Sequence, residues 1–264
     1  MTSEHIHINI MEKLKFIGII PARYASTRFP GKPLARIGSM TMIERVWRQV
    51  GRVLGNNVWV ATDDSRIYDA VAAFGGNAVM TSTEHRSGTD RCREAYEKVG
   101  SGEDVVINIQ GDEPFIEPRQ IEAVMQCFDD PATDIATLVR AFDPAGSYEV
   151  LADPNTPKVV VDNGMNAIYF SRSVIPYLRN VPVEKWPSSH TFYTHVGMYA
   201  YRAGVLDEIT RLPQSGLELA ESLEQLRWLQ GGYRIKVGVT DCSSIGIDTP
   251  QDLENAIKLL GING

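Results

Sequence analysis

The chain has 264 residues, of which 43% are hydrophobic and 22% are charged, and its formal net charge is −7 at pH 7. This length and composition predict one large α/β domain or two small ones with a substantial core. The acidic balance argues against a protein that binds nucleic acid or an anionic membrane surface, and no apolar run of about 18 residues predicts a membrane span. The three cysteines, Cys92, Cys127 and Cys242, are far apart without a CxxC pair. This pattern favours reduced thiols in the cytoplasm over disulfides or a zinc site.

The first thirteen residues differ from the rest of the chain. They lack the basic start and apolar core of a signal peptide, and Met11 offers a second start just before the first predicted strand. We therefore interpret residues 1–13 as an N-terminal extension or an expression leader. Residues 14–264 contain no repeat, low-complexity tract or linker, and we expect them to form a single domain.

Apolar runs and helical periodicities alternate along the first half of this domain. Short apolar runs predict strands at residues 14–20, 56–63, 78–81 and 104–110. Apolar residues at helical spacing, preceded by helix-start signals, predict helices at residues 41–55, 64–76, 88–100 and 118–128. This alternation predicts an α/β fold of three layers, in which helices cover both faces of a mostly parallel, Rossmann-like sheet.

The alternation is interrupted in the second half. Three predicted strands follow one another, at residues 134–142, 158–172 and 195–202, and Asp162-Asn163-Gly164 predicts a hairpin turn. The alternation then resumes with a helix at 217–230, a strand at 233–240 and a helix at 250–261. We therefore expect an antiparallel excursion between roughly residues 150 and 200.

The most concentrated positive charge lies in PARYASTRFPGKPLARIG, residues 21–38. Its four cations, Arg23, Arg28, Lys32 and Arg36, have no acidic residue among them. The segment follows the first predicted strand, at the edge where open α/β sheets bind ligands, and its prolines stiffen it. It matches neither a Walker A loop nor a GxGxxG loop. Forked arginines and a lysine suit a polyphosphate, and the alternative is an ordinary solvated surface loop.

Two acidic motifs lie at the same predicted edge. INIQGDEPFIEP (107–118) places Asp112 after the strand that ends at Gln110, and GIDTPQDLE (246–254) places Asp248 before the last helix. Carboxylate oxygens are hard ligands, so the two aspartates are a candidate Mg²⁺ site completed by substrate phosphates. The alternatives are a simple turn at Asp112 and a helix N-cap at Asp248.

The remaining candidates lie in three short motifs. HRSGTDR (85–91) places Ser87 and Gly88 at a helix start, either as a cap or as an element that binds a base or phosphate. HVGMYAYR and LEQLRWLQ contain four further polar candidates: His195, Tyr199, Glu224 and Gln225. A stripe of leucines places the last two off the core face, whereas a single His or Tyr in a strand is usually structural. No GxSxG motif or Cys–His pairing indicates a covalent nucleophile.

Taken together, these motifs resemble one known family. IIPARYASTRFPGKPL, HRSGTDR, IQGDEPFI, KVVVD…YFSR, HVGMYAYR, LEQLR and GIDTPQDLE are similar to 3-deoxy-manno-octulosonate cytidylyltransferase, the CMP-Kdo synthetase of Gram-negative bacteria. The resemblance implies a fold of the nucleotide-diphospho-sugar transferase type and the reaction of CTP with Kdo to give CMP-Kdo and diphosphate. It also implies Mg²⁺, a cytoplasmic location, a homodimer formed through the 150–200 excursion, and a role in lipopolysaccharide biosynthesis.

The resemblance also implies roles for individual residues. The catalytic positions are Arg23, Arg28, Lys32, Asp112 and Asp248, with the two aspartates as Mg²⁺ ligands. The nucleotide-binding positions are Ala22, Arg23, Ser26, Lys32, Ser87, Gly88 and Gln110. The sugar-binding positions are Arg172, His195, Tyr199, Glu224 and Gln225. The family usually has an arginine where this chain has Ser82, which leaves open whether Arg86 takes its place.

Other functions remain open at this point. The acceptor could be an 8-amino analogue of Kdo or another sugar acid, such as a sialic acid. The chain could also be a catalytically silent nucleotide-binding or regulatory subunit, or an interaction module. Both aspartates and the basic segment are present, which favours the transferase.

Overall fold

The computed structural model describes residues 13–242, 246–259 and 261. Apart from Lys13, the predicted N-terminal extension lies outside the described residues. Within the described part, nine strands form one sheet, and its main path has the order β11-β7-β10-β6-β1-β4-β5. These strands are β1 (Phe16–Ala22), β4 (Val58–Thr62), β5 (Asn77–Met80), β6 (Val105–Asn108), β7 (Ile135–Ala141), β10 (Tyr193–Arg202) and β11 (Ile235–Val239). The hairpin of β8 (Lys158–Val161) and β9 (Ala167–Ser171) joins at β10, while β2 (Arg36–Ile37) and β3 (Met40–Thr41) form a separate pair.

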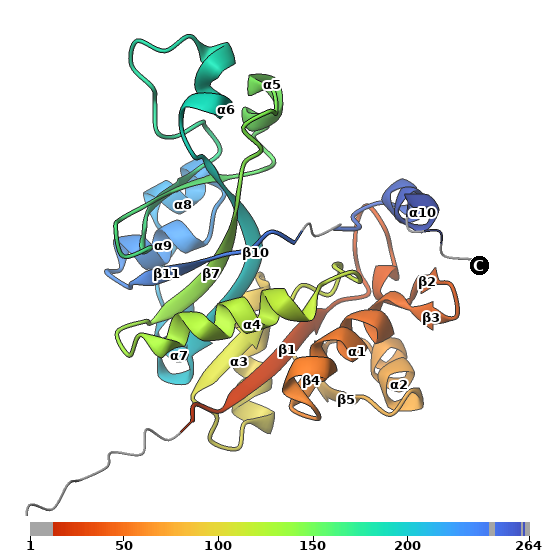
Figure 1. The fold of residues 1–264 in the computed structure, drawn as a ribbon. Coiled ribbons are helices and arrows are strands. Elements are labelled where there is room, and N and C mark those ends of the chain that lie inside the picture. The colour runs from red at the N-terminus through yellow and green to blue at the C-terminus, as the bar shows by residue number, and fades with distance from the viewer. Residues whose placement is uncertain (1–12, 243–245, 260, 262–264) are drawn as a thin grey trace, which may run out of the picture.

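The strand directions confirm the predicted fold class. β5, β4, β1 and β6 are parallel, as are β7 and β11, whereas β10 runs antiparallel to its neighbours β6 and β7. The β8–β9 hairpin is antiparallel and turns where predicted, since the Asp162 amide donates to the carbonyl oxygen of Asn166 at 2.9 Å. The antiparallel excursion therefore lies inside a sheet that is otherwise parallel (Figure 1).

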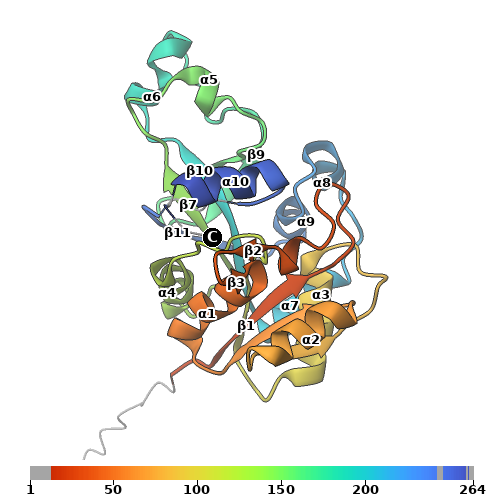
Figure 2. The same cartoon turned by 90° about the vertical axis from the view of Figure 1, so that its right-hand side faces the viewer.

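Helices cover both faces of the sheet, as the alternating side chains of β1 require. Ile20 and Ala22 pack toward α1 (Met42–Leu54), α2 (Ser65–Ala73) and α4 (Pro118–Gln126). Ile17 and Ile19 pack toward α3 (Gly88–Val99), α7 (Ala203–Thr210) and α9 (Gln225–Gln230). Successive side chains of a strand point to opposite faces, so one central strand supplies two cores. Figures 1 and 2 show the resulting three layers.

Pro21 does not end the first strand, contrary to our prediction. β1 continues to Ala22, and Pro21 is paired with Ala61 of β4. On its other side, β1 is paired with β6 only as far as Ile19. Proline has no backbone N–H to donate. The missing donor breaks no ladder hydrogen bond with β6, because the β1–β6 pairing has already ended before Pro21.

The predicted helix 217–230 is wrong, because the structure contains two helices there. α8 (Gly216–Glu221) ends before Ser222, whose φ of 52° lies in the left-handed region, and α9 begins at Gln225. A left-handed residue ends a helix and leaves carbonyl groups without partners. The Arg172 guanidinium satisfies two of them, donating to the carbonyl oxygens of Glu221 at 2.6 Å and Ser222 at 3.2 Å. Sequence periodicity carried no sign of this long-range contact.

Two stretches of the chain between β7 and β10, one before and one after the β8–β9 hairpin, extend away from the sheet (Figure 1). The first contains α5 (Tyr148–Leu151), and the second contains the 3₁₀ turn η3 (Val183–Lys185) and α6 (Trp186–Ser189). These stretches share their own apolar cluster around Leu151, Trp186 and Phe192. At the other end of the chain, α10 (Pro250–Leu259) packs with Ile37 and Met42 near the basic segment. The turns η1 (Lys32–Leu34) and η2 (Cys127–Asp129) complete the described elements. No helix among the described residues is long and apolar enough to cross a membrane.

Candidate active site

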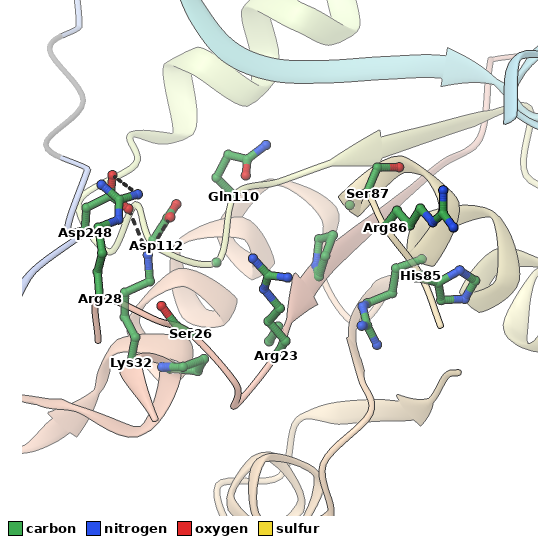
Figure 3. A pocket seen from close by; sticks show the side chains of 16 residues that line it. Arg23, Ser26, Arg28, Lys32, His85, Arg86, Ser87, Gln110, Asp112 and Asp248 are labelled. Carbon is green, nitrogen blue, oxygen red and sulfur yellow. Dashed lines mark hydrogen bonds and ion pairs between the residues drawn. The ribbon is translucent and has the colours of Figure 1, made fainter. Parts of the chain in front are cut away.

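A cavity of about 320 Å³ opens at the carboxyl ends of β1 and β6. All ten of the predicted catalytic and nucleotide-binding residues line it: Ala22, Arg23, Ser26, Arg28, Lys32, Ser87, Gly88, Gln110, Asp112 and Asp248. Pro21, Pro33, His85, Arg86, Arg91 and Gly111 complete the wall. Figure 3 shows the aspartates at one end, His85 to Ser87 at the other, and Arg23 between them. We call this cavity the nucleotide cavity.

The basic segment is a stiff loop against the cavity. Gly31 has a φ of 70° and donates its amide to the carbonyl oxygen of Tyr24 at 2.9 Å. A Cβ at Gly31 would lie 3.1 Å from the Tyr24 ring, so a side chain here would crowd the ring as well as strain the backbone. Arg66 contacts the Tyr24 ring, with its guanidinium carbon 3.3 Å from the ring centroid. This contact is a cation–π interaction that helps to hold the loop in place.

The cations of the segment do not share one role. Lys32 is largely buried, with a side chain 15% exposed, and lines the cavity, so it is not a solvated surface lysine. Arg36 is exposed, donates to the carbonyl oxygen of Ser39 and lies outside the cavity lining. Of the four cations, Arg23, Arg28 and Lys32 line the cavity and stay candidates for binding a polyphosphate, whereas Arg36 does not.

The two predicted metal ligands converge on one positive charge. Lys32 Nζ lies 2.8 Å from Asp112 Oδ2 and 3.2 Å from Asp248 Oδ1. Arg28 pairs with the other oxygen of Asp248 at 3.0 Å. The carboxylates come from segments far apart in the sequence and meet at one point of the sheet edge (Figure 3).

Asp248 is not the N-cap of α10, which was the alternative interpretation. Thr249 performs that role, because its Oγ1 accepts from the Asp252 amide at 3.1 Å. The Asp252 carboxylate in turn accepts from the amides of Asp248 and Thr249. This reciprocal cap leaves the Asp248 carboxylate available to the cavity.

Positive charge exceeds negative charge along the cavity wall. Five lining residues are Lys or Arg, against two aspartates. Arg91 is held from outside the wall, by Asp63 at 2.7 Å and by Thr81. Among the described residues, Arg23 and Arg86 form no ion pair or side-chain hydrogen bond. A pocket with surplus cations in an acidic chain is suited to a polyanionic ligand.

The HRSGTDR motif is both a cap and part of the wall. Ser87 caps α3, since its Oγ accepts from the Asp90 amide at 3.1 Å, and Gly88 begins the helix at the cavity surface. The preceding loop is held by Glu94, whose carboxylate contacts the His85 ring and accepts from the Ser82 amide. Burial opposes ionisation of Glu94, but these contacts and that of Lys98 hold its pKa at about 2. Sequence inspection missed this support, because Glu94 lies three positions beyond the end of the motif.

A second cavity, of about 470 Å³, shares Arg86 and Ser87 with the first. Its other lining residues are Asp90, Thr210, Leu212, Gln214, Glu218, Leu219, Ser222, Glu224 and Arg227. Glu224, one of the predicted sugar-binding residues, accepts from Thr89 Oγ1 at 2.8 Å and pairs with Arg227 at 2.7 Å. Burial raises the pKa of Glu224. We call this cavity the acidic cavity.

The other predicted sugar-binding residues line neither cavity. The Arg172 guanidinium is occupied by backbone carbonyl oxygens, including that of Pro154 at 2.7 Å. His195 Nε2 lies 3.0 Å from Thr137 Oγ1, and burial lowers the pKa of His195 to about 4. The Tyr199 ring packs against His195 and Trp228.

Gln225 is buried, which contradicts our prediction that it stands off the core face. The break at Ser222 places it at the start of α9 instead of in the middle of a longer helix. Its Nε2, like the Tyr199 hydroxyl, has no hydrogen-bond partner among the described residues. These two buried groups therefore have unused hydrogen-bonding capacity.

Glu113, next to Asp112, yields a pH prediction. Burial, reinforced by the negative charge of Asp112, raises the pKa of Glu113 from 4.5 to about 7. Its contribution to folding is therefore fully present below pH 4.5 and is lost as the pH rises through 7. Since one pKa unit corresponds to about 1.4 kcal/mol, Glu113→Gln should gain up to about 3 kcal/mol over the wild type between pH 5 and 8. Denaturant unfolding without divalent cations measures this, and parallel pH profiles of the two proteins would contradict it.

Comparison with known proteins identifies the chain. A family model described as cytidylyltransferase matches residues 17–235. A 3-deoxy-manno-octulosonate cytidylyltransferase of Phocaeicola vulgatus is 65% identical over 247 residues, which cover 94% of this chain and 98% of the relative. One from Escherichia coli is 46% identical over 248 residues, covering 93% and 96%. A solved structure of CMP:2-keto-3-deoxy-manno-octonic acid synthetase complexed with CTP superposes with a TM-score of 0.85 at 46% identity, covering 94% of this chain and 98% of that one.

The fold and the cation-rich cavity at its sheet edge define an enzyme of the α/β nucleotidyltransferase class. A glucose-1-phosphate thymidylyltransferase-like structure from Bacillus anthracis, 18% identical with a TM-score of 0.61, has the same fold and covers 94% of this chain. At much higher identity, the chain belongs to the 3-deoxy-manno-octulosonate cytidylyltransferase family.

Proposed function

We propose that this chain transfers CMP from CTP to 3-deoxy-manno-octulosonate (Kdo), forming CMP-Kdo and diphosphate. The observation that carries the proposal is the nucleotide cavity, where surplus cations and two converging carboxylates meet at one sheet edge. Family membership supports the same reaction, since the curated relatives are named for it and one related structure is described as a complex with CTP.

We further propose that Asp112 and Asp248 hold Mg²⁺. Both carboxylates already surround one positive charge, the Lys32 ammonium, so their arrangement suits a cation. Among the described residues, no group of three or more His, Cys, Asp or Glu side chains could hold a metal. Two carboxylates fit Mg²⁺, which commonly takes few protein ligands and completes its coordination with water and substrate phosphates. When bound, Mg²⁺ would neutralise phosphate charge and favour ionisation of the attacking hydroxyl.

The residues of the chain then position the reactants. Arg23, Arg28 and Lys32 lie where they can bind the β- and γ-phosphates and stabilise the departing diphosphate. Ser87 and Gly88 line the cavity at the positive end of α3, which supports a role for them in binding the nucleotide. The 2-hydroxyl of Kdo attacks the α-phosphorus in line with the leaving diphosphate, and catalysis is mainly positioning and charge neutralisation.

The acceptor is tested directly with purified protein, CTP, Mg²⁺ and a panel of acceptors. Diphosphate release with Kdo is the expected result. Release with 8-amino-Kdo or a sialic acid, and none with Kdo, would assign the chain to that acceptor. Absence of release with every sugar acid, despite CTP binding, would contradict the proposal and favour a silent nucleotide-binding subunit.

We also propose that the chain acts in the cytoplasm as a homodimer, in lipopolysaccharide biosynthesis. The part of the chain between β7 and β10 supports the dimer, because it leaves large apolar side chains exposed. Val150 is 64% exposed, Ile168 60% and Tyr177 75%. A partner subunit that covers such side chains would remove their apolar surface from water. Sedimentation should give a particle of twice the chain mass. Replacing Tyr177 and Ile168 by serine should lower the measured mass to that of the monomer. A wild-type monomer at micromolar concentration would contradict the dimer.

A further inference from the structure

Arg86 stands where the two cavities meet. It lines both of them, and Ser87 is the other residue that they share in the described part of the chain. The Arg86 side chain is exposed and, among the described residues, has no carboxylate or hydrogen-bond partner. By contrast, Lys32 and Arg91 of the nucleotide cavity and Arg227 of the acidic cavity each pair with a carboxylate. Arg86 is therefore a cation available to a ligand at the junction.

The acidic cavity suits a polyhydroxylated ligand better than a second polyphosphate. Asp90, Glu218 and Glu224 line it, and carboxylates accept hydrogen bonds from hydroxyl groups but repel phosphates. Its one other cation, Arg227, is held by Glu224 at 2.7 Å and lies 3.5 Å from Glu218. An anionic group on a ligand in this cavity would be attracted toward the junction, where the unpaired Arg86 lies.

The chemistry of the reaction supplies such an anion. This step rests on the proposed function, in which the attacking hydroxyl of the acceptor is bonded to C2 and its carboxylate is bonded to the same carbon. When the hydroxyl oxygen reaches the α-phosphorus, the carboxylate must lie within a few ångströms of the α-phosphate. Two like charges that close repel each other noticeably near a protein surface, so a nearby cation would favour the productive arrangement.

We propose that Arg86 binds the carboxylate of the sugar-acid acceptor and thereby selects acceptors that carry one. The guanidinium offers two parallel N–H donors, which match the two oxygens of a carboxylate. Arg86 is then a substrate-binding residue for the acceptor, whereas Arg23 serves the triphosphate in the same cavity. Figure 3 shows Arg86 at the end of the nucleotide cavity away from Asp112 and Asp248, beside Ser87.

The test compares Arg86→Gln and Arg86→Lys with Arg52→Gln, an exposed arginine on α1 outside both cavities. Steady-state rates should show the KM for Kdo raised roughly tenfold or more in Arg86→Gln, since a charge-assisted contact is lost. The KM for CTP should change less than about twofold. Arg86→Lys should recover part of the acceptor affinity, and Arg52→Gln should match the wild type. Calorimetric titration with CTP alone should give the same affinity for all four proteins.

Three results would overturn the assignment. An Arg86→Gln variant whose KM for CTP rises as much as that for Kdo would place Arg86 on the nucleotide. An Arg86→Gln variant in which the KM for Kdo and the KM for CTP are both unchanged would show that Arg86 contacts neither substrate. A wild-type enzyme that uses no sugar acid would overturn the proposed function as well, and this is visible before any variant is measured. If the wild type uses a different sugar acid, the same comparison is made with that acid.

Discussion

Asp112→Asn should lower kcat about a thousandfold or more while leaving the fold intact. The substitution removes one of the two carboxylates that converge on Lys32 and that we propose as Mg²⁺ ligands. A metal stabilises transition-state charge by several kcal/mol, and a loss of about 4 kcal/mol corresponds to roughly a thousandfold in rate. The Asp112 side chain is 33% exposed, so removing its ion pair should change the free energy of unfolding by less than about 1 kcal/mol.

Three measurements check this expectation. Diphosphate release gives kcat, thermal unfolding verifies the fold, and titration with Mn²⁺ followed by paramagnetic resonance reports cation affinity without relying on turnover. Asp69→Asn is the matched control, because Asp69 is exposed on α2 outside the cavity. Wild-type activity of Asp112→Asn at saturating Mg²⁺ would exclude Asp112 as a metal ligand.

Arg23→Ala should weaken CTP binding roughly ten- to a hundredfold and leave CMP binding almost unchanged. The β- and γ-phosphates carry most of the negative charge of CTP, and CMP lacks them. A charge-assisted hydrogen bond contributes about 1.5–3 kcal/mol, and 1.4 kcal/mol is a factor of about ten. Arg23 tests this better than Lys32, since Lys32 also holds Asp112 and Asp248. Replacing Lys32 would disturb both carboxylates, whereas Arg23 has no such partner among the described residues.

Calorimetric titration of CTP and CMP measures the effect. Arg36→Ala is the matched control, because Arg36 belongs to the same basic segment but lies outside the cavity. Added salt should reduce the wild-type preference for CTP, since Arg23 is exposed and exposed contacts are screened. Equal losses for CTP and CMP would mean that Arg23 contacts the base, ribose or α-phosphate.

The sequence by itself was sufficient to predict the three-layer fold and the location of the nucleotide cavity. Both follow from local information, because apolar periodicity predicts elements and alternating elements predict a parallel sheet. The carboxyl ends of parallel strands meet at one edge, so the segments after β1 and β6 had to be neighbours. For this reason Arg23 and Asp112, 89 positions apart in the chain, could be assigned to one site before the structure was known.

Only the tertiary structure decided how the site residues pair and which predicted ones are buried. Lys32 contacts Asp248 across 216 positions, which depends on where α10 packs and not on any local pattern. The carboxylate of Asp248 is available because Thr249 and Asp252 form the cap. The break at Ser222, which buries Gln225, is stabilised by Arg172, the residue that follows β9. These outcomes depend on contacts between distant segments, whose free energies local propensity does not contain.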